Sequence, residues 1–137
     1  MICLDTNAVI AAINQRKPWV RRRLEQALVD GVIIGIPAVV LYEIWYGIRK
    51  STRPQANAAV LATFLALDVT LWPFEPEDAE EAGDIRAALE RAGTPIGPYD
   101  ILIAAQARRR SAVLITANER EFVRVPGLKT EDWASPA

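Results

Sequence analysis

The sequence opens with MICLDTN, residues 1–7, in which a short apolar run ends in Asp5, Thr6 and Asn7. An apolar run that passes directly into a helix, here expected over residues 8–14, is typical of a buried strand in a parallel sheet. In open α/β sheets, ligands bind at the carboxyl ends of such strands. The stretch therefore predicts an α/β fold and marks Asp5 as a candidate site residue.

The rest of the chain alternates between apolar runs of strand length and segments with helical periodicity. We expect strands at 32–36, 69–72, 112–116 and 128–130, and helices at 18–30, 38–48, 56–67, 77–92, 101–110 and 119–122. This alternation predicts a mainly parallel sheet of four or five strands flanked by helices. No linker, repeat or low-complexity tract interrupts it, so we expect residues 1–137 to form a single domain.

A second carboxylate stands at the start of an apolar helix. Residues 97–107 read GPYDILIAAQA, and the turn formers Gly97 and Pro98 lead us to expect Asp100 at the N-cap of a helix over residues 101–110. Apolar residues cover nearly the whole circumference of that helix, which indicates a buried element. Asp100 then lies partly inside the protein, either as a cap worth about 1 kcal/mol or as a functional group.

A third carboxylate, Glu43, lies within a predicted helix that begins near Pro37. We expect the apolar face of this helix to consist of Leu41, Ile44, Trp45 and Ile48. Glu43 points away from that face, yet the residues one turn away from it are Val39 and Gly47. The side of the helix that carries Glu43 is therefore not an ordinary charged surface.

Three carboxylates in largely apolar settings are costly to keep ionised, and they repel one another if they converge. A divalent cation removes both costs. Mg²⁺ prefers carboxylates and waters as ligands, and it activates water and holds phosphate oxygens during hydrolysis. We therefore interpret Asp5, Glu43 and Asp100 as ligands of a Mg²⁺ site, against the alternative of three separate helix caps and surface charges.

The composition excludes several kinds of catalytic site. Histidine is absent, which excludes histidine metal sites and Ser-His-Asp triads. The single cysteine, Cys3, cannot form a disulfide within the chain, and we expect it to be a small core residue. Catalysis must therefore use carboxylates, hydroxyls, lysine or a metal ion.

The formal net charge of −1 gives the chain no overall attraction for nucleic acid. Basic residues are nevertheless clustered at 16–23, 49–53 and 108–110, where they either form solvated helix faces or contact phosphates.

The longest apolar run, residues 32–42, is too short to span a bilayer. Because residues 1–7 also lack the basic region of a secretory signal, we expect a cytoplasmic protein without a membrane segment.

In their order and spacing, these motifs resemble PIN-domain ribonucleases, and more narrowly the VapC toxins of type II toxin-antitoxin systems. The matching segments are LDTN at 4–7, the Glu43 helix, GTPIGPYDILIAA at 93–105, LITAN at 114–118, and EF, VPGL and EDW between 121 and 133. The resemblance runs essentially from end to end. It implies a three-layer PIN-like sandwich.

The resemblance also implies an activity and a site. The activity is that of an Mg²⁺- or Mn²⁺-dependent endoribonuclease that cleaves single-stranded or structured RNA, often tRNA. By the match, Asp5, Glu43 and Asp100 are the acidic ligands, and the fourth catalytic position falls on Asn118. Asparagine can offer a carbonyl oxygen but no charge, so the match leaves open whether the site holds one metal ion or two.

Four further residues near these positions receive lesser roles. By the match, Thr6 and Thr116 support the site as polar neighbours. Glu119 or Glu121 could replace the missing fourth acid, although each also suits the first turn of a short helix.

The resemblance further implies a homodimer and a VapB-like antitoxin that covers the acidic pocket, with the apolar helix at 56–67 as its expected docking surface. An alternative is a PIN-like binding module that has lost turnover, with Asn118 as the sign of that loss. A phosphoacceptor signalling domain is disfavoured, because it would need a lysine at a strand end and the last strands offer only Lys129.

Overall fold

The computed structural model describes residues 1–14 and 17–133, so position 16, the first residue of the first basic cluster, lies outside the described residues. The strands are β1 (Ile2–Leu4), β2 (Ile34–Pro37), β3 (Thr70–Trp72), β4 (Val113–Ile115) and β5 (Lys129–Glu131). They form one sheet in the order β3-β2-β1-β4-β5, with every neighbouring pair parallel. The prediction of a mainly parallel sheet is confirmed.

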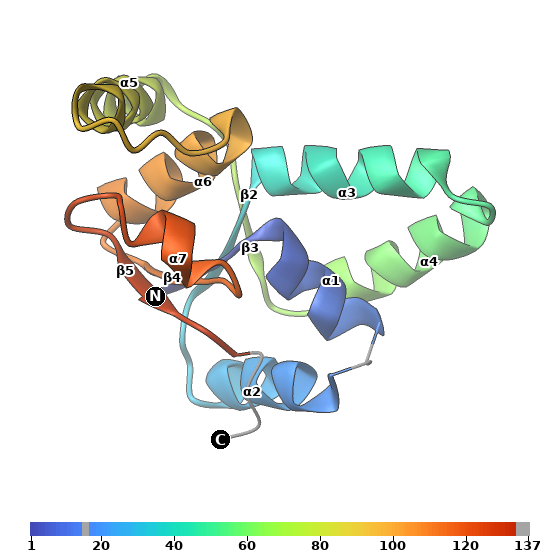
Figure 1. The fold of residues 1–137 in the computed structure, drawn as a ribbon. Coiled ribbons are helices and arrows are strands. Elements are labelled where there is room, and N and C mark those ends of the chain that lie inside the picture. The colour runs from blue at the N-terminus through green and yellow to red at the C-terminus, as the bar shows by residue number, and fades with distance from the viewer. Residues whose placement is uncertain (15–16, 134–137) are drawn as a thin grey trace.

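Helices flank this sheet (Figure 1). They are α1 (Thr6–Asn14), α2 (Pro18–Val29), α3 (Ala38–Lys50), α4 (Pro54–Leu65), α5 (Pro76–Arg91), α6 (Pro98–Arg109) and α7 (Glu119–Phe122). In the view of Figure 1, α2 lies below the sheet, α5 and α6 lie above it, and α3 and α4 form a hairpin to one side. Within residues 1–14 and 17–133, no helix combines the length and apolar character needed to cross a bilayer.

The register of the two central strands decides where the site forms. Leu4 pairs with Ile115, so the next residues, Asp5 and Thr116, leave the sheet side by side at its carboxyl edge. The backbone continues the pattern, because the Asp5 N–H donates to the Ile115 carbonyl oxygen at 3.2 Å. Side chains from separate parts of the sequence thus meet at one edge.

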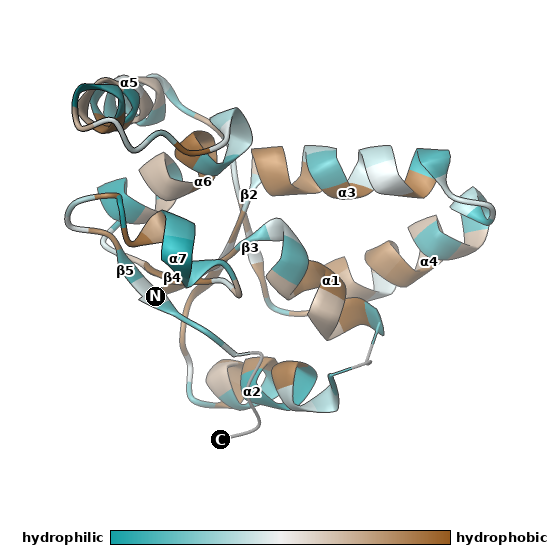
Figure 2. Cartoon of the chain, in the orientation of Figure 1, coloured by the Kyte–Doolittle hydropathy of each residue, from teal (hydrophilic) through white to brown (hydrophobic). Residues whose placement is uncertain are grey.

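The core consists of the strands and the helix faces turned toward them, as the brown colouring of the central strands in Figure 2 shows. Cys3 is buried, as expected. Gly35 of β2 is required by close packing, since a Cβ there would lie 2.0 Å from the indole ring of Trp72 on β3. The core therefore depends on a close contact between β2 and Trp72 that any side chain at position 35 would prevent.

Two local predictions for the helices are wrong. Asp100 does not cap α6, which begins two residues earlier at Pro98 with Gly97 as its N-cap, because proline suits the first helical turn. On α3, Trp45 is exposed while Val40 is buried with Ile44 and Ile48. The buried face of α3 is rotated because this helix packs against α1, α4 and α6 together.

The acidic start of α5 and the basic end of α6 hold these two helices together. Asp78 is fully buried and accepts hydrogen bonds from Arg109 Nε at 2.6 Å and Arg110 Nη1 at 2.8 Å. Burial opposes its ionisation, but the two arginines outweigh burial and lower the pKa of Asp78 to about 2. Arg108 pairs with Glu81. The 108–110 cluster thus holds helices together, and the prediction that it could contact phosphates is not supported.

Candidate metal centre

The four predicted site residues line one cleft of about 150 Å³ at the carboxyl edge of the sheet. Its lining is Asp5, Thr6, Asn7, Glu43, Asp100, Ile103, Asn118 and Phe122. The starts of α1, α3 and α6 face this region in Figure 1, which explains how residues so distant in sequence reach it. The structure therefore brings together Asp5, Glu43, Asp100 and Asn118, while their roles stay predictions.

Asp5 occupies the turn between β1 and α1 and is only 5% exposed. Its Oδ1 accepts a hydrogen bond from the Ala8 N–H at 2.8 Å, so Asp5 caps the first turn of α1. Burial raises the pKa of Asp5, hydrogen bonds from Thr116 and Ala8 lower it, and the charge of Glu43 raises it, for a net increase. The carboxylate is held in place but carries a charge that burial disfavours.

Glu43 reaches the cleft from the second turn of α3 and is partly buried. Its Oε1 accepts a hydrogen bond from Thr6 Oγ1 at 2.7 Å. Thr6 is the first residue of α1, so this bond links the start of α1 to α3 and orients Glu43. The supporting role predicted for Thr6 agrees with this contact.

Asp100 lies in the first turn of α6 and is half-buried. Burial raises its pKa to about 6, with further contributions from the charges of Glu121, Glu43 and Asp5. Burial and the neighbouring acids thus both disfavour a negative charge at Asp100.

Asn118 connects the cleft to α7. Its backbone N–H donates to Thr116 Oγ1 at 2.9 Å, and its side-chain Nδ2 donates to Glu121 Oε2 at 3.0 Å. Glu119 instead accepts a hydrogen bond from Thr130 on β5 at 2.7 Å. Of the two glutamates predicted as substitutes, Glu121 is therefore the one associated with the cleft.

The donor set suits a hard cation, although the side chains do not form a finished metal site. Among the described residues, no group of three or more His, Cys, Asp or Glu is arranged to hold a metal ion. The carboxylates are like charges and repel one another, which opposes closer approach in the absence of a cation. The available donors are all oxygens, the ligands that Mg²⁺ and Mn²⁺ prefer. A bound cation would lower the raised pKa values of Asp5 and Asp100, because it stabilises their ionised forms.

Sequence reasoning underrated one acid and missed another. The sequence gives Glu121 only a lesser role as a substitute acid, yet it makes the largest charge contribution to the pKa of Asp100. Asp132 was not considered, yet its charge also raises the pKa of Asp5. A signal for Asp132 exists in the sequence, because it follows a strand directly, as Asp5 does.

Comparisons with known proteins identify the family of this chain. The PIN domain family matches residues 2–128. The chain is 41% identical over 131 residues to the tRNA(fMet)-specific endonuclease VapC of Shigella flexneri, covering 96% of each chain. It is 36% identical over 130 residues to ribonuclease VapC2 of Rickettsia felis, covering 95% of this chain and 96% of the relative.

Solved structures give the same result. The fold superposes with a TM-score of 0.90 and 34% identity on VapBC2 from Rickettsia felis bound to a DNA fragment from its promoter, covering 97% of this chain and 99% of that one. For DNA-bound VapBC from Salmonella typhimurium the TM-score is 0.86 at 37% identity, with the same coverage. Since both kinds of match span nearly the whole chain, the protein belongs to the PIN-domain family and, within it, to the VapC ribonucleases.

Proposed function

We propose that this chain is a divalent-metal-dependent endoribonuclease that hydrolyses phosphodiester bonds of tRNA in the acidic cleft. The observation that carries the proposal is the convergence of Asp5, Glu43 and Asp100 on one cleft, with two of the three pKa values raised. The choice of tRNA is supported by the names of relatives that match 95% or more of the chain, which are described as tRNA(fMet)-specific endonucleases.

Asp5 and Asp100 would hold Mg²⁺ or Mn²⁺, and Glu43 would complete the ligand set. The cation supplies an activated water and neutralises charge on the phosphate. The chain itself fixes the carboxylates: Thr116 and the Ala8 N–H hold Asp5, and Thr6 holds Glu43. These contacts orient the acids before substrate arrives.

Glu121 supplies the negative charge that asparagine lacks at the fourth position in this proposal. Asn118 lines the cleft and donates a hydrogen bond to Glu121, and the charge of Glu121 raises the pKa of Asp100.

The alternative function is that of a PIN-like module in which the neutral Asn118 has ended turnover and only partner binding remains. The two functions differ in whether the purified chain cleaves RNA.

The direct test is cleavage of a tRNA(fMet) transcript by the purified chain in Mg²⁺, in Mn²⁺ and in EDTA. We expect cleavage that requires the metal and that falls at least about 100-fold in Asp5→Asn, since removal of a catalytic charge typically costs several kcal/mol. Asp68→Asn, a change at an exposed acid outside the cleft, is the matched control and should cleave normally. A folded wild-type chain that leaves the tRNA intact under both metals would contradict the enzyme and favour the binding module.

We also propose a VapB-like antitoxin as the partner of this chain in the cytoplasm. A second groove of about 230 Å³ runs between α1, α3 and α4, with exposed apolar side chains at Ile10 and Val60 and with Glu43 in its lining. An occupant of this groove would reach the acidic cleft, because Glu43 lines both. Structures of VapBC complexes similar to this chain support the choice of partner.

The groove is tested with a purified VapB-like antitoxin. Val60→Asp places a charge in the apolar groove and should weaken antitoxin binding at least about tenfold in calorimetry. Val123→Asp, at a site that is 71% exposed on α7's far end, should bind normally. Equal affinity of the two variants would exclude the groove as the docking site.

The homodimer stays a prediction of the family resemblance. An exposed aromatic face on α3 and α6, formed by Tyr42, Trp45, Tyr46 and Tyr99, offers a surface that self-association would bury. Sedimentation of the purified chain at several concentrations tests the expected dimer.

A further inference from the structure

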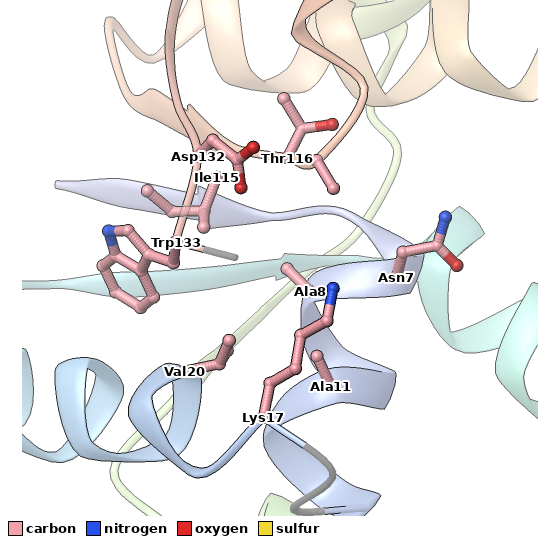
Figure 3. Close-up of a pocket in the computed structure, with 10 residues that line it drawn as sticks. Asn7, Ala8, Ala11, Lys17, Val20, Ile115, Thr116, Asp132 and Trp133 are labelled. Atoms are coloured by element: carbon pink, nitrogen blue, oxygen red, sulfur yellow. The ribbon is translucent and has the colours of Figure 1, made fainter. Parts of the chain in front are cut away.

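A second, smaller cavity borders the acidic cleft at the same edge of the sheet. It has a volume of about 80 Å³ and lies between α1, α2 and the ends of β4 and β5. Its floor is apolar, and its mouth carries polar groups. Val20, Ile115 and Trp133 line the floor, and Asn7, Lys17 and Asp132 lie at the mouth (Figure 3).

The small cavity and the acidic cleft adjoin each other, because they share a lining residue. Asn7 lines both hollows. Thr116 lines the small cavity and hydrogen-bonds Asp5, which lines the cleft. An extended molecule that occupies the acidic cleft would therefore pass over the mouth of the small cavity within one or two of its own repeating units.

Lys17 is placed to act on such a molecule. It stands immediately before α2, and Figure 3 shows its ammonium group directed from α2 toward the opening between Asn7 and Thr116. Within the part of the chain that the structure describes, the Lys17 side chain forms no hydrogen bond or ion pair. Two basic residues of α2 differ in this respect, because Arg21 pairs with Glu25 and Arg23 pairs with Glu131.

The surroundings make this charge important for an anionic substrate. Asp5, Glu43, Asp100 and Glu121 lie in or beside the cleft, and the arginines at 108–110 are occupied by Asp78 and Glu81. Among the described residues that line the two hollows, Lys17 is the one cation. RNA that enters the cleft needs a positive charge beside it to offset repulsion between carboxylates and phosphates.

We propose that Lys17 and Asn7 form a phosphate subsite, which binds the RNA backbone phosphate next to the one that is cleaved. The inference rests on the proposed ribonuclease function and deepens it. The Lys17 ammonium donates to non-bridging phosphate oxygens, and the Asn7 amide donates beside it. The apolar floor below strengthens the interaction, because charges attract more strongly at the border of a low-dielectric region. Lys17 is thus a positioning residue, outside the reacting atoms.

The subsite is tested by RNA binding without cleavage. The purified chain is titrated in EDTA against a fluorescein-labelled tRNA(fMet) transcript, with anisotropy measured from 50 to 200 mM salt. Lys17→Ala should raise Kd about tenfold, the loss of one charge-assisted contact. It should also reduce the slope of log K against log salt by about 0.7 to 0.9, the contribution of one phosphate.

Two variants serve as controls. Lys129→Ala removes the same charge from an exposed residue on β5 at the amino edge of the sheet, since Lys129 pairs with Val113, the first residue of β4. It should leave the Kd and the slope unchanged. Lys17→Arg keeps the charge and should keep the slope, which separates loss of the contact from loss of the fold. In cleavage assays Lys17→Ala should raise KM while kcat stays within about twofold.

Each other outcome has a definite meaning. A wild-type chain that binds and cleaves RNA, together with an unchanged slope in Lys17→Ala, overturns the subsite and leaves the ribonuclease intact. A lower melting temperature in Lys17→Ala without a change in slope would show that Lys17 supports the fold beside Asp132, and this also overturns the subsite. Weakened antitoxin binding with unchanged RNA binding would assign Lys17 to the partner. A wild-type chain that neither binds nor cleaves RNA overturns both proposals.

Discussion

Asp100 shows how a single carboxyl group can link the site to the stability of the protein. Burial and the charges of Glu121, Glu43 and Asp5 raise its pKa to about 6, above the ordinary value of about 3.9. Between about pH 4 and pH 6 the folded state therefore keeps a proton that the unfolded state has released. The stabilising contribution of this group is complete below pH 4 and is lost as the pH rises through 6.

Asp100→Asn should remove this loss, because the amide cannot ionise. In metal-free buffer we expect the variant to be at least as stable as the wild type at pH 7.5, with a difference in melting temperature that grows from pH 4.5 to pH 7.5. Asp84→Asn, on the exposed side of α5, is the control and should follow the wild type at each pH. Thermal unfolding by circular dichroism in EDTA measures the effect, and a variant less stable than wild type at pH 7.5 would contradict it.

At the scale of elements, the contact between α5 and α6 depends on one buried acid. Asp78 is fully buried and forms ion pairs with Arg109 and Arg110. It also forms a capping box with Glu75 at the start of α5. The pKa of Asp78 is lowered to about 2. Its contribution to stability is therefore present above about pH 4 and is lost as the pH falls toward 2.

Asp78→Ala should reduce the free energy of unfolding by about 3 to 5 kcal/mol, because it leaves two arginines without their buried partner. Glu77→Ala, an exposed change in the same helical turn, should cost less than about 0.5 kcal/mol. Urea unfolding at pH 7 provides the comparison. Similar midpoints for the two variants would show that the ion pairs contribute little.

Sequence patterns located these helices but not their contacts. The acids in the first turn of α5, Glu77 and Asp78, are typical of a helix start, and recognising that pattern needs only local information. The burial of Asp78 could not be predicted, because its partners come from α6 and the sequence does not say which helices are adjacent. For the same reason the arginines at 108–110 were open to a reading as phosphate contacts.

At the scale of the whole molecule, a bound cation should stabilise the fold. Mg²⁺ at about 100 times its Kd should add roughly 2.7 kcal/mol to the free energy of unfolding and so raise the melting temperature at pH 7.5. The rise should shrink at pH 5, where Asp100 with its pKa of about 6 is protonated and cannot serve as a ligand. Differential scanning fluorimetry at both pH values tests this. An identical rise in Asp100→Asn would place the cation elsewhere.

The sequence predicted the parallel sheet and three acids of the cleft for the same physical reason. Apolar runs report burial, and Asp5, Glu43 and Asp100 were conspicuous because they interrupt such runs. The strand order β3-β2-β1-β4-β5 was not predictable, because several crossover arrangements share one local pattern. Glu121 was underrated because an acid in the first turn of α7 looks like an ordinary helix-start charge.

The central position of β1 also has a consequence for biosynthesis. This strand is synthesised before the strands that flank it, and one of them, β4, begins only at Val113. A nascent polypeptide shorter than this has one side of its middle strand without hydrogen-bonding partners, and it lacks Asn118. Such distant pairing slows folding, and the cleft can be completed only after β4 and Asn118 have been synthesised.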